Sequence, residues 1–329
     1  MYLSRICIKF GILFSVLSIT SCDNDGFDMN NLPPDAIWAN AEHNAFTDLA
    51  EYKGKIYCCF REAKNHLSYD GSIRVLESCD GEKWESIGIL SDPTYDFRDP
   101  KLTVTPDNRL MLTFGRRKEN ESVYPWNICK FITDYEIASK NLSFEGSHEM
   151  SINDDSYFSS YWIWRPKWID GKCYGIAYRY LETPILVVSE DGVNYSKIST
   201  LYAWGSEADI DKLPDGRIVI VMRAYEGNGF IGFSTNFIDW TWEKLNQKLE
   251  SPCLINYRNQ FIVAGRGENG TTIYKYSDSL FETIFSINGH SDSAYPGYII
   301  KDDNIWISYY DMWKGRALIF IKKLPLILF

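Results

Sequence analysis

The sequence predicts an all-β fold and, within that class, a six-bladed β-propeller, with five blades plus an extra hairpin as the alternative. One unit recurs six times: a short strand, a tight polar turn, a second strand ending in a polar residue, a loop and a third strand. Successive turns lie about 43 to 63 residues apart, a spacing that suits the four-stranded blades of a propeller. No segment keeps apolar residues at the 3.6-residue helical period over ten or more positions, which excludes a helical repeat.

The first unit places two strands at Phe46–Leu49 and Ile56–Phe60, around a turn at Lys53-Gly54-Lys55. The later turns are rich in Gly, Asn and Asp, which tolerate the positive φ of hairpin turns. They are expected at Pro106-Asp107-Asn108, Asp170-Gly171-Lys172, Pro214-Asp215-Gly216, Arg258-Asn259 and Asp302-Asp303-Asn304. The third strands are expected at Ile73–Glu77, Ile128–Ile132, Ile185–Ser189, Phe230–Ser234, Thr272–Tyr276 and Ala317–Ile321.

A serine–aspartate–aromatic segment follows several of these third strands. It reads Ser78-Cys79-Asp80-Gly81-Glu82-Lys83-Trp84, then Ser189-Glu190-Asp191-Gly192-Val193-Asn194-Tyr195, and more weakly Ser234-Thr235-Asn236 with Trp240, Ser277-Asp278 with Phe281 and Thr133-Asp134 with Tyr135. Ser and Asp side chains bond backbone amides in such turns, so each copy is expected to staple a hairpin and to carry no chemistry. The last unit has no clear fourth strand, and residues near Ile37 and Trp38 are expected to supply it.

The N-terminal segment predicts export and lipidation. Residues 1–21 have the layout of a signal peptide, with Arg5 and Lys9 ahead of an apolar stretch too short to span a bilayer. Ile19-Thr20-Ser21-Cys22 resembles the bacterial lipobox, which implies a lipid on Cys22 and an outer-membrane lipoprotein of Bacteroidetes type, at the cell surface or the periplasmic face. An ordinary cleaved signal peptide is the alternative. Residues 22–36 are expected to be a flexible tether, and residues 37–329 the propeller domain.

Composition excludes several classes of partner. The net charge of −10 argues against nucleic acid, because phosphate binding needs clustered Lys and Arg. Beyond Cys22, the cysteines at 58, 59, 79, 129, 173 and 253 lack the spacing of a metal site, so we expect no metal and no other cofactor. We expect most of them to be small buried residues, with Cys58 and Cys59 on opposite faces of a strand.

Polar residues recur at one end of the strands. The starts of the innermost strands carry His43, Arg98-Asp99, Trp164-Arg165, Glu207 and Tyr295, and the second strands end at Arg61-Glu62, Arg116, Arg179, Arg223, Arg266 and Asp311. In a propeller both sets lie on one face around the axis. Guanidinium groups bind carboxylates in bidentate fashion, so this pattern favours an anionic or heavily hydroxylated ligand. The alternative is that these arginines join neighbouring blades through ion pairs with Glu62, Asp99 or Asp311.

The staples, the six repeats and the order of polar residues together resemble the sialidase superfamily with its Asp-box (BNR) repeats, over nearly the whole mature chain. Ser293-Ala294-Tyr295-Pro296-Gly297 resembles the segment with the nucleophilic tyrosine, and Ser206-Glu207-Ala208 the segment whose glutamate activates it. Arg223 and Arg266 match the second and third arginines of the family's carboxylate clamp, and Asp70 its acid/base aspartate. The resemblance implies a retaining exo-glycoside hydrolase, in which a carboxylate takes the proton of the attacking tyrosine.

The resemblance fails at the first clamp arginine, because the corresponding stretch His43–Leu49 contains none. Either Arg61, Arg98 or Arg165 replaces it, or the substrate is not sialic acid. His43 suits hydroxyl groups, and Trp162 and Trp164 could stack on a sugar, which favours the second reading; His66 is a further candidate in the loop before Asp70. The sequence therefore predicts a hydrolase of acidic or hydroxyl-rich glycans at the cell surface. A lyase using His43 or His66 with a tyrosine, and a non-catalytic glycan-binding lipoprotein, are the alternatives.

Overall fold

The computed structural model describes residues 28–29, 31–119, 126–153, 161–257, 260–277, 280–287, 289 and 292–328. The expected signal peptide, Cys22, the turn at Arg258-Asn259 and the staple residue Asp278 lie outside these residues. Pro33–Phe329 form one compact unit. Within the described residues, no helix is long and apolar enough to cross a membrane.

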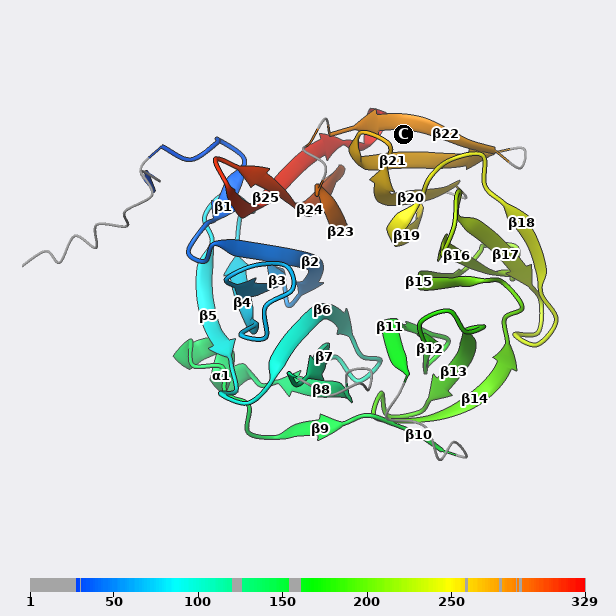
Figure 1. Ribbon diagram of the computed structural model, residues 1–329, viewed down its shortest axis with the longest axis horizontal. Helices are drawn as coiled ribbons and strands as arrows, with labels where there is room; N and C mark the ends of the chain where they lie inside the picture. Colours follow the sequence, from blue (N-terminus) through cyan, green and yellow to red (C-terminus); the bar gives the residue numbers. More distant parts are fainter. Residues whose placement is uncertain are drawn as a thin grey trace, which may run out of the picture. The chain divides into compact units, whose positions relative to one another are not determined.

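The unit is built almost entirely of antiparallel strands around a common centre (Figure 1). The strands nearest the centre are β2 (His43–Tyr52), β6 (Asp96–Val104), β11 (Trp162–Ile169), β15 (Gly205–Lys212), β19 (Glu250–Tyr257) and β23 (Ala294–Lys301). The second strands are β3 (Lys55–Ala63), β7 (Leu110–Arg117), β12 (Lys172–Tyr178), β16 (Ile218–Ala224), β20 (Gln260–Gly267) and β24 (Asn304–Trp313).

The third strands are β4 (Ser72–Ser78), β8 (Trp126–Ile132), β13 (Ile185–Ser189), β17 (Phe230–Ser234), β21 (Gly270–Ser277) and β25 (Arg316–Pro325), which contain all six predicted segments. The outer strands are β5 (Glu85–Leu90), β9 (Ser147–Glu149), β14 (Asn194–Thr200), β18 (Thr241–Lys244) and β22 (Leu280–Ser286), with β10 (Ser151–Asn153) added beside β14. A short helix α1 (Asp134–Ser139) and a 3₁₀ turn η2 (Leu326–Leu328) complete the described elements.

These strands form a propeller, but not the expected set of six, or alternatively five, separate blades. Three sheets of four strands and one of five stand apart from one another, so four blades are separate. The first and last units merge into one eight-stranded sheet, because His43 of β2 pairs in parallel with Ala317 of β25. The periodicity of the sequence indicates how many hairpins there are, but it does not show whether the first and last hairpins are hydrogen-bonded to each other.

The chain closes on itself where the sequence predicts it. Strand β1 (Ala36–Trp38) lies antiparallel to β25, with Ala36 opposite Phe320 and Trp38 opposite Ile319. The indole N–H of Trp38 donates to Glu62 (2.5 Å), and the guanidinium of Arg74 lies over the indole ring at 5.1 Å. The N-terminal strand therefore supplies the outer strand that the last unit lacks.

The hairpin staples make the expected hydrogen bonds. The backbone N–H of Gly81 donates to Ser78 Oγ (2.8 Å), and that of Lys83 to Asp80 Oδ1 (2.8 Å). The copies at Ser189–Tyr195 and Ser234–Trp240 repeat this pattern. The segment Thr133-Asp134-Tyr135 is different and the staple prediction is wrong there: Thr133 caps α1 in a capping box with Glu136.

The core consists of apolar layers between neighbouring sheets. Cys58 belongs to the cluster on one side of β3 and Cys59 to the cluster on the other, as the alternation of a strand predicts. Among the described residues all six of these cysteines are free thiols, and Cys79 alone is exposed. Close packing between inner strands requires Gly297, where a Cβ would come within 2.4 Å of the backbone nitrogen of Leu49.

Candidate functional site

Each strand nearest the centre carries a two-residue irregularity that aims side chains toward the axis. The register shifts at Phe46-Thr47, Asp99-Pro100, Arg165-Pro166, Ser206-Glu207, Ser251-Pro252 and Tyr295-Pro296. In five of these β-bulges the first residue has a positive φ, between 40° and 63°. Non-glycine residues adopt this conformation only where surrounding structure imposes it, and such residues gather at functional sites. The bulges thus define a repeated position around the axis.

Tyr295 and Glu207 meet at this position. The Tyr295 hydroxyl donates to Glu207 Oε1 at 2.5 Å, and both residues are buried. The other oxygen, Oε2, accepts the backbone N–H of Ser251 (2.9 Å) and an N–H of Arg223 (3.2 Å). Burial and the negative charge of Glu207 raise the pKa of the Tyr295 phenol well above its usual value. The pair therefore rests as a neutral phenol on a carboxylate that is held ready to accept its proton.

Two arginines flank the pair, and both are already bound to carboxylates. Arg223 contacts Glu250 (3.4 Å) as well as Glu207. Arg266 contacts Glu250 (2.8 Å) and Asp292 (3.2 Å). The structure thus brings Tyr295, Glu207, Arg223 and Arg266 into one cluster, which Glu250 links.

A second cluster adjoins the first through Asp292. Asp292 Oδ1 accepts the Tyr310 hydroxyl (2.8 Å), whereas Oδ2 lies 3.6 Å from His66 Nδ1 and 3.9 Å from His43 Nε2. Its histidine and tyrosine neighbours lower the pKa of Asp292, although burial opposes this. Burial lowers the pKa of His43, and neither of its ring nitrogens has a hydrogen-bond partner among the described residues.

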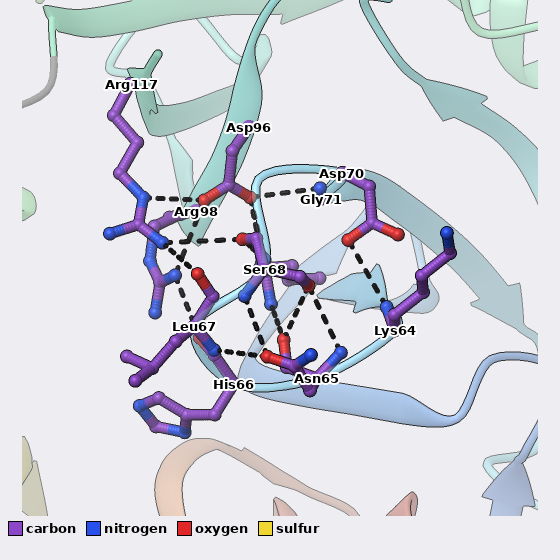
Figure 2. Close-up of polar contacts among 11 residues, drawn as sticks. Lys64, Asn65, His66, Leu67, Ser68, Asp70, Gly71, Asp96, Arg98 and Arg117 are labelled. Carbon is purple, nitrogen blue, oxygen red and sulfur yellow. Dashed lines mark hydrogen bonds and ion pairs between the residues drawn. The ribbon is translucent and has the colours of Figure 1, made fainter. Parts of the chain in front are cut away.

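His66 comes from a loop, residues 64–71, that is fixed from within by arginines (Figure 2). Arg61 donates to the carbonyls of Asn65 (3.1 Å) and Ser68 (2.7 Å), and Arg98 to that of His66 (3.0 Å). Asp96 neutralises both arginines, and the Arg61 side chain is 0% exposed. Arg61 and Arg98, expected at the substrate, therefore hold the loop.

Asp70 lies at the far end of the same loop, where it accepts the backbone N–H of Lys64 (3.3 Å). Its side chain points toward Lys64 and away from His66 and Arg98 (Figure 2). Burial opposes the change, but hydrogen bonds from Ser68 and Lys64 lower the pKa of Asp70. The expected acid/base aspartate is thus exposed, ionised at neutral pH and turned to its own loop.

Two other expected ligand residues belong to the interior. Arg165 binds Asp48 (2.6 Å) and donates to the carbonyl of Pro296 (2.9 Å), which fixes the backbone next to Tyr295. Trp164 is 1% exposed and packs edge-on against the Tyr295 ring, at 5.6 Å between ring centroids. A sugar has no access to either side chain in this arrangement. Arg116 and Arg179 lie over the aromatic rings of Tyr95 and Tyr161.

Sequence reasoning gave no role to Glu250 or Asp292, and it offered Asp99 only as an ion-pair partner of the arginines. Asp99 occupies a bulge with φ 48°, is buried, and has an oxygen without a hydrogen-bond partner among the described residues. Burial raises the pKa of Asp99, and the charge of Glu207 adds to the effect. The signal that could have found Asp99 is the proline after the bulge residue, which recurs in four of the inner strands.

In the stretch His43–Leu49, which lacks the first clamp arginine, the bulge residue is Phe46. Its ring packs against those of Tyr295 (4.7 Å) and His66 (5.2 Å). The guanidinium of Arg98 lies over the phenyl ring of Phe46, at 5.0 Å from the ring centroid. The floor between the two clusters is therefore aromatic.

Solved structures with the same fold include glycosidases. No protein-family model and no curated protein matches the chain. A Dyadobacter fermentans protein of unknown function is 18% identical over 88% of this chain and 97% of that one (TM-score 0.74). A Penicillium chrysogenum α-L-arabinanase is 13% identical over 90% and 98% (TM-score 0.68), and a Hadza microbial sialidase 12% over 87% and 66% (TM-score 0.67). At these identities the likeness establishes the β-propeller fold.

Proposed function

We propose that this protein is a glycoside hydrolase that acts on hydroxyl-rich or acidic glycans by a retaining route through Tyr295. The observation that supports this most is the 2.5 Å hydrogen bond from the buried Tyr295 hydroxyl to Glu207. A phenol with a pKa near 10 is a poor nucleophile unless a base takes its proton as it attacks. Glu207 is oriented for that role by Ser251 and Arg223.

Charge favours a hydroxyl-rich glycan over sialic acid. Glu207, Glu250 and Asp292 share Arg223 and Arg266, and Lys248 also pairs with Glu250, so both guanidinium groups already have carboxylate partners. A ligand carboxylate would have to compete with Glu250 for both arginines. Sugar hydroxyls both donate and accept hydrogen bonds, and they can bind this mixed rim without displacing an ion pair.

In the proposed reaction, the Tyr295 oxygen attacks the anomeric carbon while its proton passes to Glu207 Oε1. The bond to the leaving sugar breaks, and its oxygen takes a proton from a general acid. Water then attacks the anomeric carbon and gives a proton to the carboxylate left by the general acid, while the bond to the tyrosine oxygen breaks and the phenol takes its proton back from Glu207. Two displacements at one carbon retain the anomeric configuration.

We assign the general acid to Asp99 rather than to Asp70. Burial raises the pKa of Asp99, which favours its protonated form, whereas hydrogen bonds lower the pKa of Asp70. Asp99 lies near the pair, since it interacts electrostatically with both Tyr295 and Glu207. Asp70 faces Lys64 instead.

We also propose that the eight-stranded sheet acts as two blades, β2–β5 and β23–β25 with β1, which makes six blades in all. The two halves meet at the pair His43 and Ala317. An experimental structure with a ladder extending well beyond this pair would contradict that count.

The lipid on Cys22 is also a proposal, and palmitate labelling that persists in Cys22→Ala would refute it.

A released-sugar assay on arabinan, uronate-containing and sialylated glycans tests the function. Wild type should release a monosaccharide with retained configuration by NMR, and Tyr295→Phe should lose at least about a thousandfold in kcat/KM, as expected when a covalent route is closed. Asp70→Asn is the matched control for Asp99→Asn, and only the latter should lose activity.

The alternatives have distinct signatures. An unsaturated product absorbing in the ultraviolet would identify a lyase, and affinity without turnover a binding protein. Unchanged turnover in Tyr295→Phe would refute the mechanism.

A further inference from the structure

We propose that His43, His66 and Asp292 bind a divalent transition-metal ion such as Zn²⁺ beside the Tyr295–Glu207 pair. This replaces the expectation, drawn from cysteine and histidine spacing alone, that the protein holds no metal. His43 lies on β2, His66 in loop 64–71 and Asp292 just before β23. Because these residues are far apart in the chain, their spacing in the sequence does not indicate a shared site.

The geometry is close to that of a zinc site. One ligand atom from each residue lies within 4.8 Å of the other two. Asp292 Oδ2 is 3.6 Å from His66 Nδ1 and 3.9 Å from His43 Nε2. Tetrahedral zinc with bonds of about 2.0 to 2.2 Å separates its ligand atoms by about 3.4 Å. Shifts of a few tenths of an ångström would therefore complete the two separations to Asp292, and the ligand atoms of the two histidines, within 4.8 Å of each other, would approach by up to about 1.4 Å as the ion binds.

His43 provides an independent reason for a ligand here. Its side chain is 7% exposed, and both ring nitrogens are without a hydrogen-bond partner among the described residues. A buried polar group left unpaired costs about 1 to 3 kcal/mol, so native structures rarely keep one. The 3.9 Å separation from Asp292 is too long for a hydrogen bond and leaves room for an ion between the two.

The surroundings orient the three ligands. Tyr310 and Arg266 both donate to Asp292 Oδ1, which leaves Oδ2 for the ion. Arg98 holds the carbonyl of His66, and the loop is braced at Asn65 and Ser68 (Figure 2). Outer contacts of this kind fix the direction of metal ligands and raise metal affinity.

Three protein ligands leave a fourth position open, as in catalytic zinc sites. Phe46 contacts the rings of both His66 and Tyr295, so this position adjoins the proposed reaction centre. We infer that it takes a hydroxyl or carboxylate oxygen of the glycan, in place of the first clamp arginine. This second step rests on the proposed function, whereas metal binding does not.

Titration calorimetry of the full-length protein with ZnCl₂ tests the metal site. Wild type should bind one zinc ion per chain. His66→Ala and Asp292→Asn should each weaken binding by more than about 100-fold, because even the partners of metal ligands contribute 10- to 100-fold. His148→Ala removes an exposed histidine on β9, and Cys79→Ser the exposed thiol, and both should bind zinc like wild type.

Thermal unfolding keeps the test valid if one variant is damaged. Zinc should raise the midpoint of wild type and of Tyr295→Phe, and leave that of His66→Ala unchanged. No zinc binding by wild type, or binding lost in Cys79→Ser but kept in His66→Ala, would overturn the metal site.

The glycan step has its own measurement. Inactive Tyr295→Phe should bind glycan at least tenfold more tightly with zinc than after chelation. Equal affinities would overturn that step, while the one-to-one zinc binding would stand.

Discussion

Replacing Asp96 by Ala is expected to be among the most destabilising single changes in this protein. Asp96 is fully buried and neutralises Arg61 at 2.8 Å, Arg117 at 2.7 Å and Arg98 at 3.4 Å. Its Oδ1 also accepts the backbone N–H of Gly71 (3.0 Å). The substitution would leave Arg61, which has no exposed surface, without a counter-charge.

The expected magnitude follows from that burial. Removing one partner of a buried ion pair costs about 3 to 5 kcal/mol, because the other charge remains desolvated. At about 2 to 4 °C per kcal/mol for a large domain, the thermal midpoint should fall by about 6 to 20 °C. Urea unfolding should give the same free energy, and protease should cut loop 64–71 sooner than in wild type.

Glu190→Ala is the matched control. It breaks the exposed Lys172–Glu190 pair (2.7 Å), and exposed pairs are worth about 0 to 1 kcal/mol. If Asp96→Ala lowers stability no more than Glu190→Ala, the arginines on loop 64–71 are not held by this carboxylate and the account of His66 fails with it.

Three further predictions concern the scaffold. Hydrogen bonds from Asn194 lower the pKa of Asp191 to about 2, although burial opposes this shift. The ionised Asp191 carboxylate therefore stabilises the fold above pH 3.8, and this contribution is lost as the pH falls toward 2. Asp191→Asn should therefore be less stable than wild type at pH 7 in urea unfolding, and should lose less stability between pH 4 and 2; an equal loss in both would refute this. Gly297→Ala should destabilise more than Gly54→Ala, since only the first Cβ meets backbone, and differential scanning fluorimetry giving the reverse order would contradict it. Trp38→Ala should lower the free energy of unfolding by about 2 kcal/mol, because it weakens the packing of β1. Unchanged hydrogen exchange in β25 would argue against closure of the ring by β1.

The repeat could be predicted from the sequence because its signals are local. Turn residues such as Lys53-Gly54 and the alternation of Cys58 and Cys59 depend on the nearest neighbours alone, and the structure follows them. The capping box of Thr133 and Glu136 also depends on neighbouring residues alone, and the sequence could have predicted it in place of a weak hairpin staple.

The roles of the polar residues could not be predicted in the same way, because they depend on distant partners. Arg61 and Arg223 occupy equivalent places at the ends of second strands, yet one is buried against Asp96 and the other reaches Glu207. The merging of the first and last units depends on contact between His43 and Ala317, which are 274 positions apart in the chain. Periodicity carries no information about such encounters.

At the bulges, the choice of side chain near the axis is independent of the hydrogen bonds that pair the strands. Phe46, Asp99, Arg165, Ser251 and Tyr295 share one backbone shape, although their side chains are apolar, acidic, basic, small and phenolic. Because the irregular residues interrupt the register, the neighbouring pairs form regardless of which side chain occupies the place. A substitution at a bulge residue can therefore change a side chain near the axis while the strand that carries it keeps its pairing.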